Sequence, residues 1–226
     1  MTDAILRPRL SHGPVLAGFT TRAFSPADEG LDTARTRLAD ATGLPVASVG
    51  QVHGADVAVV REAGHIPKHD GLVTDVPRLV LSVVAADCAL VLLADAEAGV
   101  VGACHSGWRG TVAGIVGETV RQMQALGAEP ERTQAYLAPC ISAEAFEVGE
   151  EVAAAFDDAV VVRRPEWPRP HVDLQADLRR QLADAGVMEV EADASCTVGD
   201  ERFYSYRAEG GTPGRMLGFV GIREFR

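Results

Sequence analysis

The chain has 226 residues, and its 32 Asp and Glu outnumber its 21 Lys and Arg, which gives a formal net charge of −11. This balance argues against a nucleic-acid scaffold, which would carry a basic patch, and against docking on an anionic membrane surface. With 47% hydrophobic and 23% charged residues, the chain can bury a sizeable core, and its length favours one domain over residues 1–226.

No segment of the sequence has the pattern of a secretory signal or a membrane span. The start, MTDAILRPRL, lacks the apolar run that a signal requires. The longest apolar segment, 79–94, is interrupted by Ser82 and Asp87, so it is too short and too charged to cross a bilayer. We therefore expect a cytoplasmic protein, in which the four cysteines are free thiols because no CxxC pair occurs.

Hydrophobic patterning predicts alternating helices and strands. We expect helices over 34–42, 111–126 and 173–185. We expect strands over 57–61, 79–86, 89–94, 100–104 and 218–222. The segments 79–86 and 89–94 form a nearly continuous apolar run, as a strand covered on both faces would, and 163–170 is a Pro-rich surface loop. Because helices and strands are interleaved, the class is mixed α/β.

The segment GACHSGWRG, at 102–110, is typical of a strand, a tight turn and a helix. The turn carries His105, Trp108 and Arg109. Free backbone N–H groups at the start of the helix favour an anion, and Arg109 could make a bidentate contact to phosphate or carboxylate. The plainer alternative is a helix start with a packed Trp108.

An aspartate interrupts the apolar segment AADCA at 85–89. A buried Asp87 is costly unless it is paired, and the candidate partners are Arg109 and Arg207. Asp87 and Cys88 point to opposite faces of a regular strand, so only a kink or a strand end brings both into one cleft. Cys88 on its own is equally compatible with a core position.

The segment QVHG, at 51–54, places His53 at a turn before a strand. His53, Cys88 and His105 form no local motif, but together they are three ligands from three strand ends. Two His, one Cys and an open fourth position would suit a catalytic zinc, and copper could compete for the site. If His105 faces the cleft, alternation turns Cys104 to the core.

Two further segments carry chemistry-bearing side chains. His65 and His69 are spaced as HxxxH, but Pro67 breaks the helix that would align them, so we expect a solvated loop. The segment FYSYR, at 203–207, is either an aromatic strand with one exposed Arg or a binding wall. In the second case its rings stack on a planar ligand and Arg207 holds an anion.

The motifs just described occur in a fixed order along the chain. They are QVHG at 51–54, ADC at 86–88, HSGWRG at 105–110, APCI and FEVG within 138–149, and FYSYR at 203–207. With FTTR at 19–22, this pattern resembles the bacterial laccase-domain family, also known as multicopper polyphenol oxidases or peptidoglycan editing factors. The resemblance runs from about Gly18 to Ile222.

The resemblance implies a single α/β domain of mixed β-sheets flanked by helices. It implies a metal site of His53, Cys88 and His105, usually with zinc. It further implies a purine nucleoside as the small-molecule substrate. The implied reactions are phosphorolysis of adenosine, inosine, guanosine or methylthioadenosine, and deamination of adenosine. The catalytic set is then these three residues with Asp87, which could orient a ligand or act as a base. The substrate-binding set is Gln51, Trp108, Arg109, Tyr206 and Arg207, with arginines for phosphate and rings for the purine.

Three alternatives remain open. A copper phenol oxidase could use the same ligands, although six His in total are few for a multicopper site. Cys88 could instead be a nucleophile with His53 or His105 as its base, in a hydrolase that edits peptidoglycan precursors. The last alternative is a binding or regulatory protein with a vestigial site.

Overall fold

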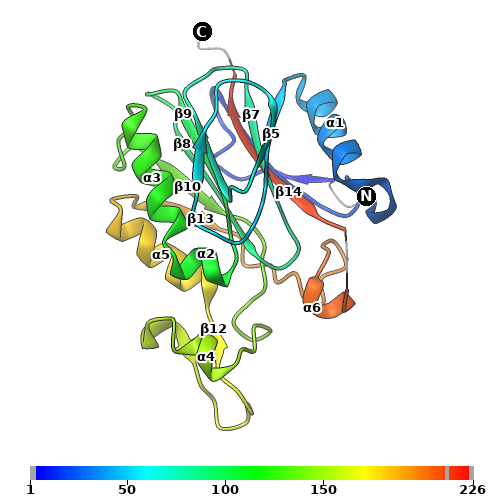
Figure 1. The fold of residues 1–226 in the computed structure, drawn as a ribbon, viewed down its shortest axis with the longest axis vertical. Coiled ribbons are helices and arrows are strands. Elements are labelled where there is room, and N and C mark those ends of the chain that lie inside the picture. The colour runs from blue at the N-terminus through cyan, green and yellow to red at the C-terminus, as the bar shows by residue number, and fades with distance from the viewer. Residues whose placement is uncertain (1–3, 212–213, 224–226) are drawn as a thin grey trace.

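The structure, a computed structural model, describes residues 4–211 and 214–223. Its first sheet has the spatial order β1 (Ile5–Leu6), β2 (Val15–Thr20), β14 (Met216–Ile222), β7 (Val80–Ala85), β3 (Val46–Gly50), β5 (Gly64–Pro67). β14 pairs antiparallel with β2 and β7, whereas β3 pairs parallel with β7 and β5. The C-terminal strand therefore lies in the middle of a sheet (Figure 1).

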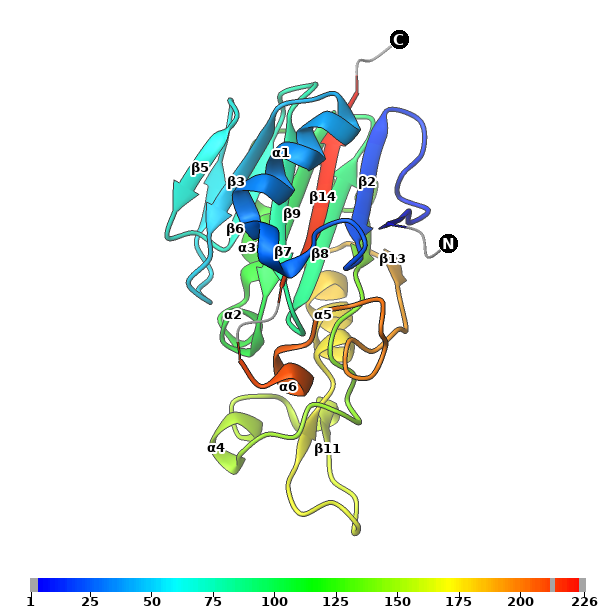
Figure 2. The same ribbon diagram turned by 90° about the vertical axis from the view of Figure 1, so that its right-hand side faces the viewer.

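The second sheet has the order β13 (Glu189–Ala192), β10 (Gln134–Leu137), β8 (Ala89–Asp95), β9 (Val100–Ser106), β6 (Gly71–Thr74), β4 (Val57–Val59). It is also mixed, because β8 and β9 pair antiparallel while β4 and β6 pair parallel. A short hairpin, β11 (Val161–Val162) and β12 (His171–Val172), stands apart from both sheets. The predicted loop 163–170 is the tip of this hairpin, at the bottom of Figure 2.

The α-helices are α1 (Gly30–Thr42), α2 (Trp108–Val112), α3 (Ile115–Ala125), α4 (Glu150–Ala153), α5 (Leu174–Asp184) and α6 (Tyr206–Glu209). The long ones, α1, α3 and α5, cover the outer faces of the two sheets. α1 packs Ala34 and Leu38 on the first sheet. α3 and α5 pack on the second sheet, so α1 lies on the opposite side of the molecule from them (Figure 1). Between the sheets, side chains of both, such as Leu81 and Leu92, form one apolar cluster.

These layers confirm the predicted mixed α/β class and the mixed sheets flanked by helices. The apolar run 79–94, however, is divided between the two sheets. The chain leaves β7 after Ala85, bends at 86–88 and enters β8 at Ala89. Apart from Ser82 in β7 and Asp95 at the end of β8, both strands are apolar, because each sheet is covered on both faces. The bend that results is the structural origin of the pocket described below.

The predicted helix 111–126 is wrong as a single element. Helix α2 already begins at Trp108, and the chain breaks at Gly114, whose φ of 77° is left-handed, before α3 starts. The helix predicted at 34–42 begins earlier, at Gly30. The helix predicted at 173–185 is confirmed as α5, where the Asp173 side chain accepts a hydrogen bond from the Ala176 N–H at 2.9 Å. Among the described residues, no helix has the length and apolar composition that crossing a membrane requires.

Candidate functional site

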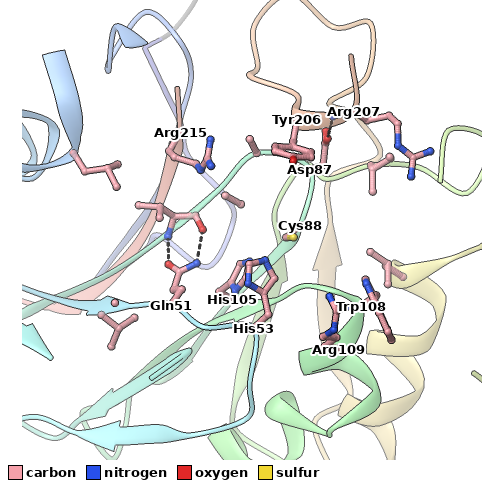
Figure 3. Close-up of a pocket in the computed structure, with 18 of the residues that line it drawn as sticks. Gln51, His53, Asp87, Cys88, His105, Trp108, Arg109, Tyr206, Arg207 and Arg215 are labelled. Carbon is pink, nitrogen blue, oxygen red and sulfur yellow. Dashed lines mark hydrogen bonds between the residues drawn. The ribbon is translucent and has the colours of Figure 1, made fainter. Parts of the chain in front are cut away.

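A pocket of about 770 Å³ opens where the chain crosses between the two sheets (Figure 3). Its wall includes every residue of the expected catalytic and substrate-binding sets: Gln51, His53, Asp87, Cys88, His105, Trp108, Arg109, Tyr206 and Arg207. Its size lies in the range of ligand pockets. Residues far apart in the sequence therefore meet at one cavity.

His53, Cys88 and His105 form the core of this pocket. One ligand atom from each lies within 4.8 Å of the others. His105 belongs to β9, Cys88 to the bend between β7 and β8, and His53 to the turn that follows β3. The two imidazole rings are nearly perpendicular, with their centroids 4.9 Å apart. A thiolate and two imidazoles are a donor set that suits zinc or copper, so the residues present fit a metal ion.

Asp70 supports two of these side chains, and sequence reasoning missed it. Its carboxylate is fully buried and bonds His105 Nδ1 at 2.9 Å. It also accepts the backbone N–H groups of residues 52–54, at 3.1, 3.0 and 2.8 Å. Asp70 thus fixes both the His105 ring and the turn that carries His53. Its position before Gly71 resembles an ordinary Asp-Gly turn, and its burial was the signal that the sequence did not give.

The cluster alters the protonation of Cys88 and His105. Burial raises the pKa of the Cys88 thiol, but hydrogen bonds from His105 and His53 outweigh this and lower it. Burial lowers the pKa of His105, but its hydrogen bonds to Asp70 and Cys88 outweigh this and raise it. Without a metal, the cluster therefore favours a thiolate beside an imidazolium. Since Asp70 holds Nδ1, the other ring nitrogen of His105 is directed to Cys88.

The other cysteines have no such environment. Cys104 is buried in the apolar cluster between the second sheet and its helices, as alternation along β9 predicted. Burial raises the pKa of Cys104 and of Cys140 to about 12. These thiols are protonated at neutral pH, so Cys88 is chemically distinct from both.

Asp87 and Cys88 both line the pocket because the backbone bends at this point. Asp87 has a φ of 82°, in the left-handed region, and lies between the strands rather than inside one. Of the partners expected for Asp87, Arg207 is confirmed, but through its backbone N–H group and not its guanidinium. The Asp87 carboxylate accepts the Thr197 hydroxyl at 2.6 Å and the backbone N–H of Arg207 at 2.7 Å. It therefore connects the bend to the segment 197–207.

The expected anion-binding groups differ in the contacts that they already make with other protein groups. The Arg207 guanidinium donates to the carbonyl oxygens of Ala145 and Glu147, at 3.1 and 3.0 Å. The Arg109 guanidinium lies 4.3 Å from the centre of the Trp108 ring. Helix α2, which follows this turn, has only five residues, so its dipole is weak.

The aromatic segment 203–207 is not a strand. Phe203 and Tyr204 are buried, and the Tyr204 hydroxyl donates to the Ser25 carbonyl at 2.9 Å. Tyr206 begins α6 and is 60% exposed above Cys88 in Figure 3. The binding wall therefore consists of Tyr206 and Arg207, without the two buried rings.

The side chain of Gln51 has a positional role in addition to lining the pocket. Its amide nitrogen donates to the Val84 carbonyl and its amide oxygen accepts the Val84 N–H, both at 2.8 Å (Figure 3). This pair extends the β3–β7 contact by one side chain and anchors the turn that carries His53. The substrate-binding role expected for Gln51 stays a prediction.

His65 was expected in a solvated loop; it is exposed as expected, but the loop is wrong. It lies on β5, lines the pocket, and bonds the Ser48 hydroxyl through Nδ1 at 3.0 Å. His69 lies beyond the strand, where its Nδ1 bonds the Pro67 carbonyl at 2.8 Å. Pro67 does prevent a helix, but the segment pairs with β3 instead.

The chain is similar to several known proteins in sequence and in fold. A purine nucleoside phosphorylase of Deinococcus radiodurans is 43% identical over 196 residues, which cover 83% of this chain and 76% of that protein. Adenosine deaminase RL5, from an unknown prokaryotic organism, is 37% identical over 191 residues, 76% of this chain and 72% of that protein. The crystal structure of YlmD from Geobacillus stearothermophilus has a TM-score of 0.87 at 29% identity, and covers 99% of this chain and 98% of that chain.

The family assignment rests on the greater part of the chain. Residues 23–223 match the family described as "Multi-copper polyphenol oxidoreductase laccase". This range contains all three candidate ligands and Asp70. The His–Cys–His cluster and the family together indicate metal binding, and the names of the relatives indicate an enzyme of purine nucleosides. The chain belongs to this laccase-domain family.

Proposed function

We propose that the pocket phosphorolyses purine nucleosides, including adenosine, inosine, guanosine and methylthioadenosine, and deaminates adenosine as a second activity. The observation that carries this proposal is the His53–Cys88–His105 cluster in a pocket that four arginines line. The 43% identical relative that is named a purine nucleoside phosphorylase supports the same reaction.

We assign His53, Cys88 and His105 as the residues that would hold a zinc ion. Such an ion supplies a Lewis acid that polarises a substrate oxygen or a water molecule. Asp70 would keep His105 in the tautomer whose free nitrogen reaches the metal position, since it bonds Nδ1 at 2.9 Å. We propose zinc because a closed-shell ion suits non-redox chemistry at a site of two His and one Cys.

Phosphorolysis requires residues that bind the phosphate, residues that bind the purine and residues that position these groups. A phosphate oxygen attacks C1′ of the ribose, the N-glycosidic bond breaks, and the purine leaves with the electron pair and takes up a proton. The pocket arginines would neutralise the phosphate. Trp108 and Tyr206 would stack on the purine. Asp87 would act as a positioning residue, because Thr197 and the Arg207 backbone already bond its carboxylate.

The test is product identification from adenosine with and without phosphate, using protein of measured metal content. The proposal predicts adenine and ribose 1-phosphate only when phosphate is present. Inosine would indicate deamination, which needs water but no phosphate. Absence of turnover with adenosine, inosine and methylthioadenosine would refute the proposed reaction.

One observation favours a second candidate, a Cys/His hydrolase of the peptidoglycan-editing kind. Asp70, His105 and Cys88 form a consecutive hydrogen-bonded series in which the thiol pKa is lowered, the arrangement of an activated nucleophile. Amide or ester cleavage by metal-free protein, abolished by alkylation of Cys88, would support this candidate.

A multicopper oxidase is not favoured. In the described part of the chain, His53, Cys88 and His105 are the one cluster of three or more candidate ligands. That is a place for one ion, whereas a multicopper centre needs several. Copper could still occupy this site, and oxygen uptake with a phenol at stoichiometric copper would reveal such an activity.

A further inference from the structure

Arg35 lies on the face of α1 that packs against the first sheet. Its helical neighbours on that face are Leu31, Ala34 and Leu38, at the spacing of an apolar stripe. Ala34 and Leu38 are fully buried in the cluster beneath the helix. An arginine in this stripe is unusual, and its side chain is only 17% exposed. The arginine therefore needs a partner at the sheet.

The structure supplies that partner only in part. Arg35 Nη1 bonds the Asp32 carboxylate at 3.0 Å, but Asp32 is fully exposed, so solvent screens this pair. Arg35 Nε is buried and has no hydrogen-bond partner among the described residues. An unsatisfied buried donor on a charged group is costly. The side chain is therefore missing an acceptor on its inner side.

A second polar atom on the same face also lacks a partner. Ser82 Oγ is buried without a hydrogen bond among the described residues. Val80, Ser82 and Val84 alternate along β7, and both valines contact the cluster under α1, so Ser82 faces α1 as well. The layer between α1 and the first sheet thus contains two unsatisfied polar atoms, both closed to solvent.

Arg35 lines the same pocket as the His–Cys–His cluster, together with Arg215. In Figure 3, Arg215 lies on the side of the pocket where Gln51 lies, whereas Arg109 and Arg207 lie on the other side. The pocket wall holds four arginines and one acid, Asp87, whose carboxylate is already bonded. A positive pocket in a chain of net charge −11 selects a small anion.

We propose that Arg35 binds phosphate at the α1 end of the pocket. This inference rests on the proposed function and names a residue of its phosphate subsite. Phosphate offers several acceptor oxygens to the planar guanidinium fork of Arg35, whose pair with the exposed Asp32 solvent screens. The assignment moves the anion away from Arg207, whose guanidinium already donates to two carbonyl oxygens. The Trp108 side of the pocket is then left for the purine.

The phosphate group could come from inorganic phosphate or from a nucleoside 5′-monophosphate. We assign inorganic phosphate, because a phosphorolytic reaction needs it as a separate co-substrate. Calorimetric titration of metal-loaded protein with inorganic phosphate and, separately, with AMP distinguishes the two sources. The phosphate titration is repeated with a C-nucleoside present, whose carbon–carbon glycosidic bond cannot be phosphorolysed.

The variants are Arg35→Gln, Arg35→Lys and, as a matched control, Arg121→Gln. Arg121 is an exposed helical arginine that is paired with Glu118, outside the pocket. We expect phosphate Kd to rise at least tenfold in Arg35→Gln, by less in Arg35→Lys, which keeps the charge but loses the fork, and less than twofold in Arg121→Gln.

The proposal is overturned if wild-type protein binds no phosphate with or without the C-nucleoside, if AMP alone binds, or if Arg35→Gln keeps the wild-type Kd. If Arg35→Gln does not fold, as judged by circular dichroism, the Arg35→Lys comparison decides in the same way. Phosphate binding that depends on Arg35 in a protein without nucleoside turnover would keep the subsite and refute the proposed reaction, so the two failures are distinguishable.

Discussion

Substitution of Asp70 by Asn is the perturbation that the structure defines most sharply. Asn has nearly the same shape as Asp, but one carboxylate oxygen becomes an NH₂ donor. In the native structure one oxygen bonds His105 Nδ1 and the His53 N–H, and the other bonds the Val52 and Gly54 N–H groups. If the amide nitrogen takes the place of the second oxygen, the Val52 and Gly54 N–H groups lose their acceptor. If it takes the place of the first, the His53 N–H group loses its acceptor, and His105 keeps a bond only by changing its tautomer.

The magnitude follows from these contacts. Each such donor left without its acceptor costs about 1–3 kcal/mol, so one or two of them cost roughly 1–6 kcal/mol in the free energy of unfolding. The same change frees the His105 ring and the turn of His53. Loss of such a supporting hydrogen bond lowers metal affinity by about 10–100-fold. The effect on affinity is therefore expected to accompany the loss of stability.

The assays are urea unfolding of metal-free protein and chelator competition for the metal. Asp75→Asn serves as the control, because Asp75 pairs with Arg61 near the surface at 2.9 Å and its loss costs about 0–1 kcal/mol. If Asp70→Asn matched Asp75→Asn in both stability and metal affinity, the claim that Asp70 organises this site would be refuted.

Three further predictions concern the thiols, the helix break and a buried ion pair. In metal-free protein at pH 7, iodoacetamide should label Cys88 before Cys104 and Cys140, since of these three thiols only Cys88 has a lowered pKa. Bound metal should protect Cys88 from labelling. Equal labelling of the three thiols would contradict the environment assigned to Cys88. Gly114→Ala should lower stability by about 1–2 kcal/mol because of its left-handed φ of 77°, whereas Gly117→Ala inside α3 should raise it by about 0.5–1 kcal/mol; urea unfolding that reversed this order would rule out the break. Burial raises the pKa of Asp95, but hydrogen bonds from Glu129, Ala98 and Arg132 outweigh this and lower it. The stability that ionised Asp95 contributes is present above its unfolded-state pKa and is lost as pH falls through its folded-state pKa. The difference in unfolding free energy between wild type and Asp95→Asn should therefore be wide at pH 7 and narrow below about pH 4, and a difference independent of pH would contradict this.

The mixed α/β class was predictable because it depends on local patterning. Apolar runs give strands, and the Asp173 cap with its following turn gives α5. The division of 79–94 between two sheets was not predictable in this way, because each half is apolar for the same reason. Likewise, Gly114 and Gly117 look alike in sequence, yet only Gly114 adopts the left-handed conformation that ends a helix.

The candidate site depends even more on contacts that local sequence patterning does not reveal. His53, Cys88 and His105 were grouped as candidate ligands from three strand ends, and the resemblance assigned them as a metal site, since separate strand ends carry no local spacing. The role of Asp70 was not predicted, because it depends on backbone N–H groups 16–18 residues away in the chain. Asp87 was correctly expected to need a partner, and Arg207 is one, but the sequence did not show that the bond uses its backbone N–H group or that Thr197 is a second partner.

The measurement that tests the central claim most directly compares wild type and Cys88→Ala, each with and without phosphate, for release of purine from adenosine. The two proteins are matched for folding by circular dichroism, and their metal content is measured. We expect wild-type protein to release adenine with phosphate and Cys88→Ala to release none. Phosphate-dependent cleavage that persists in Cys88→Ala would contradict the assignment of the His53–Cys88–His105 pocket as the active site.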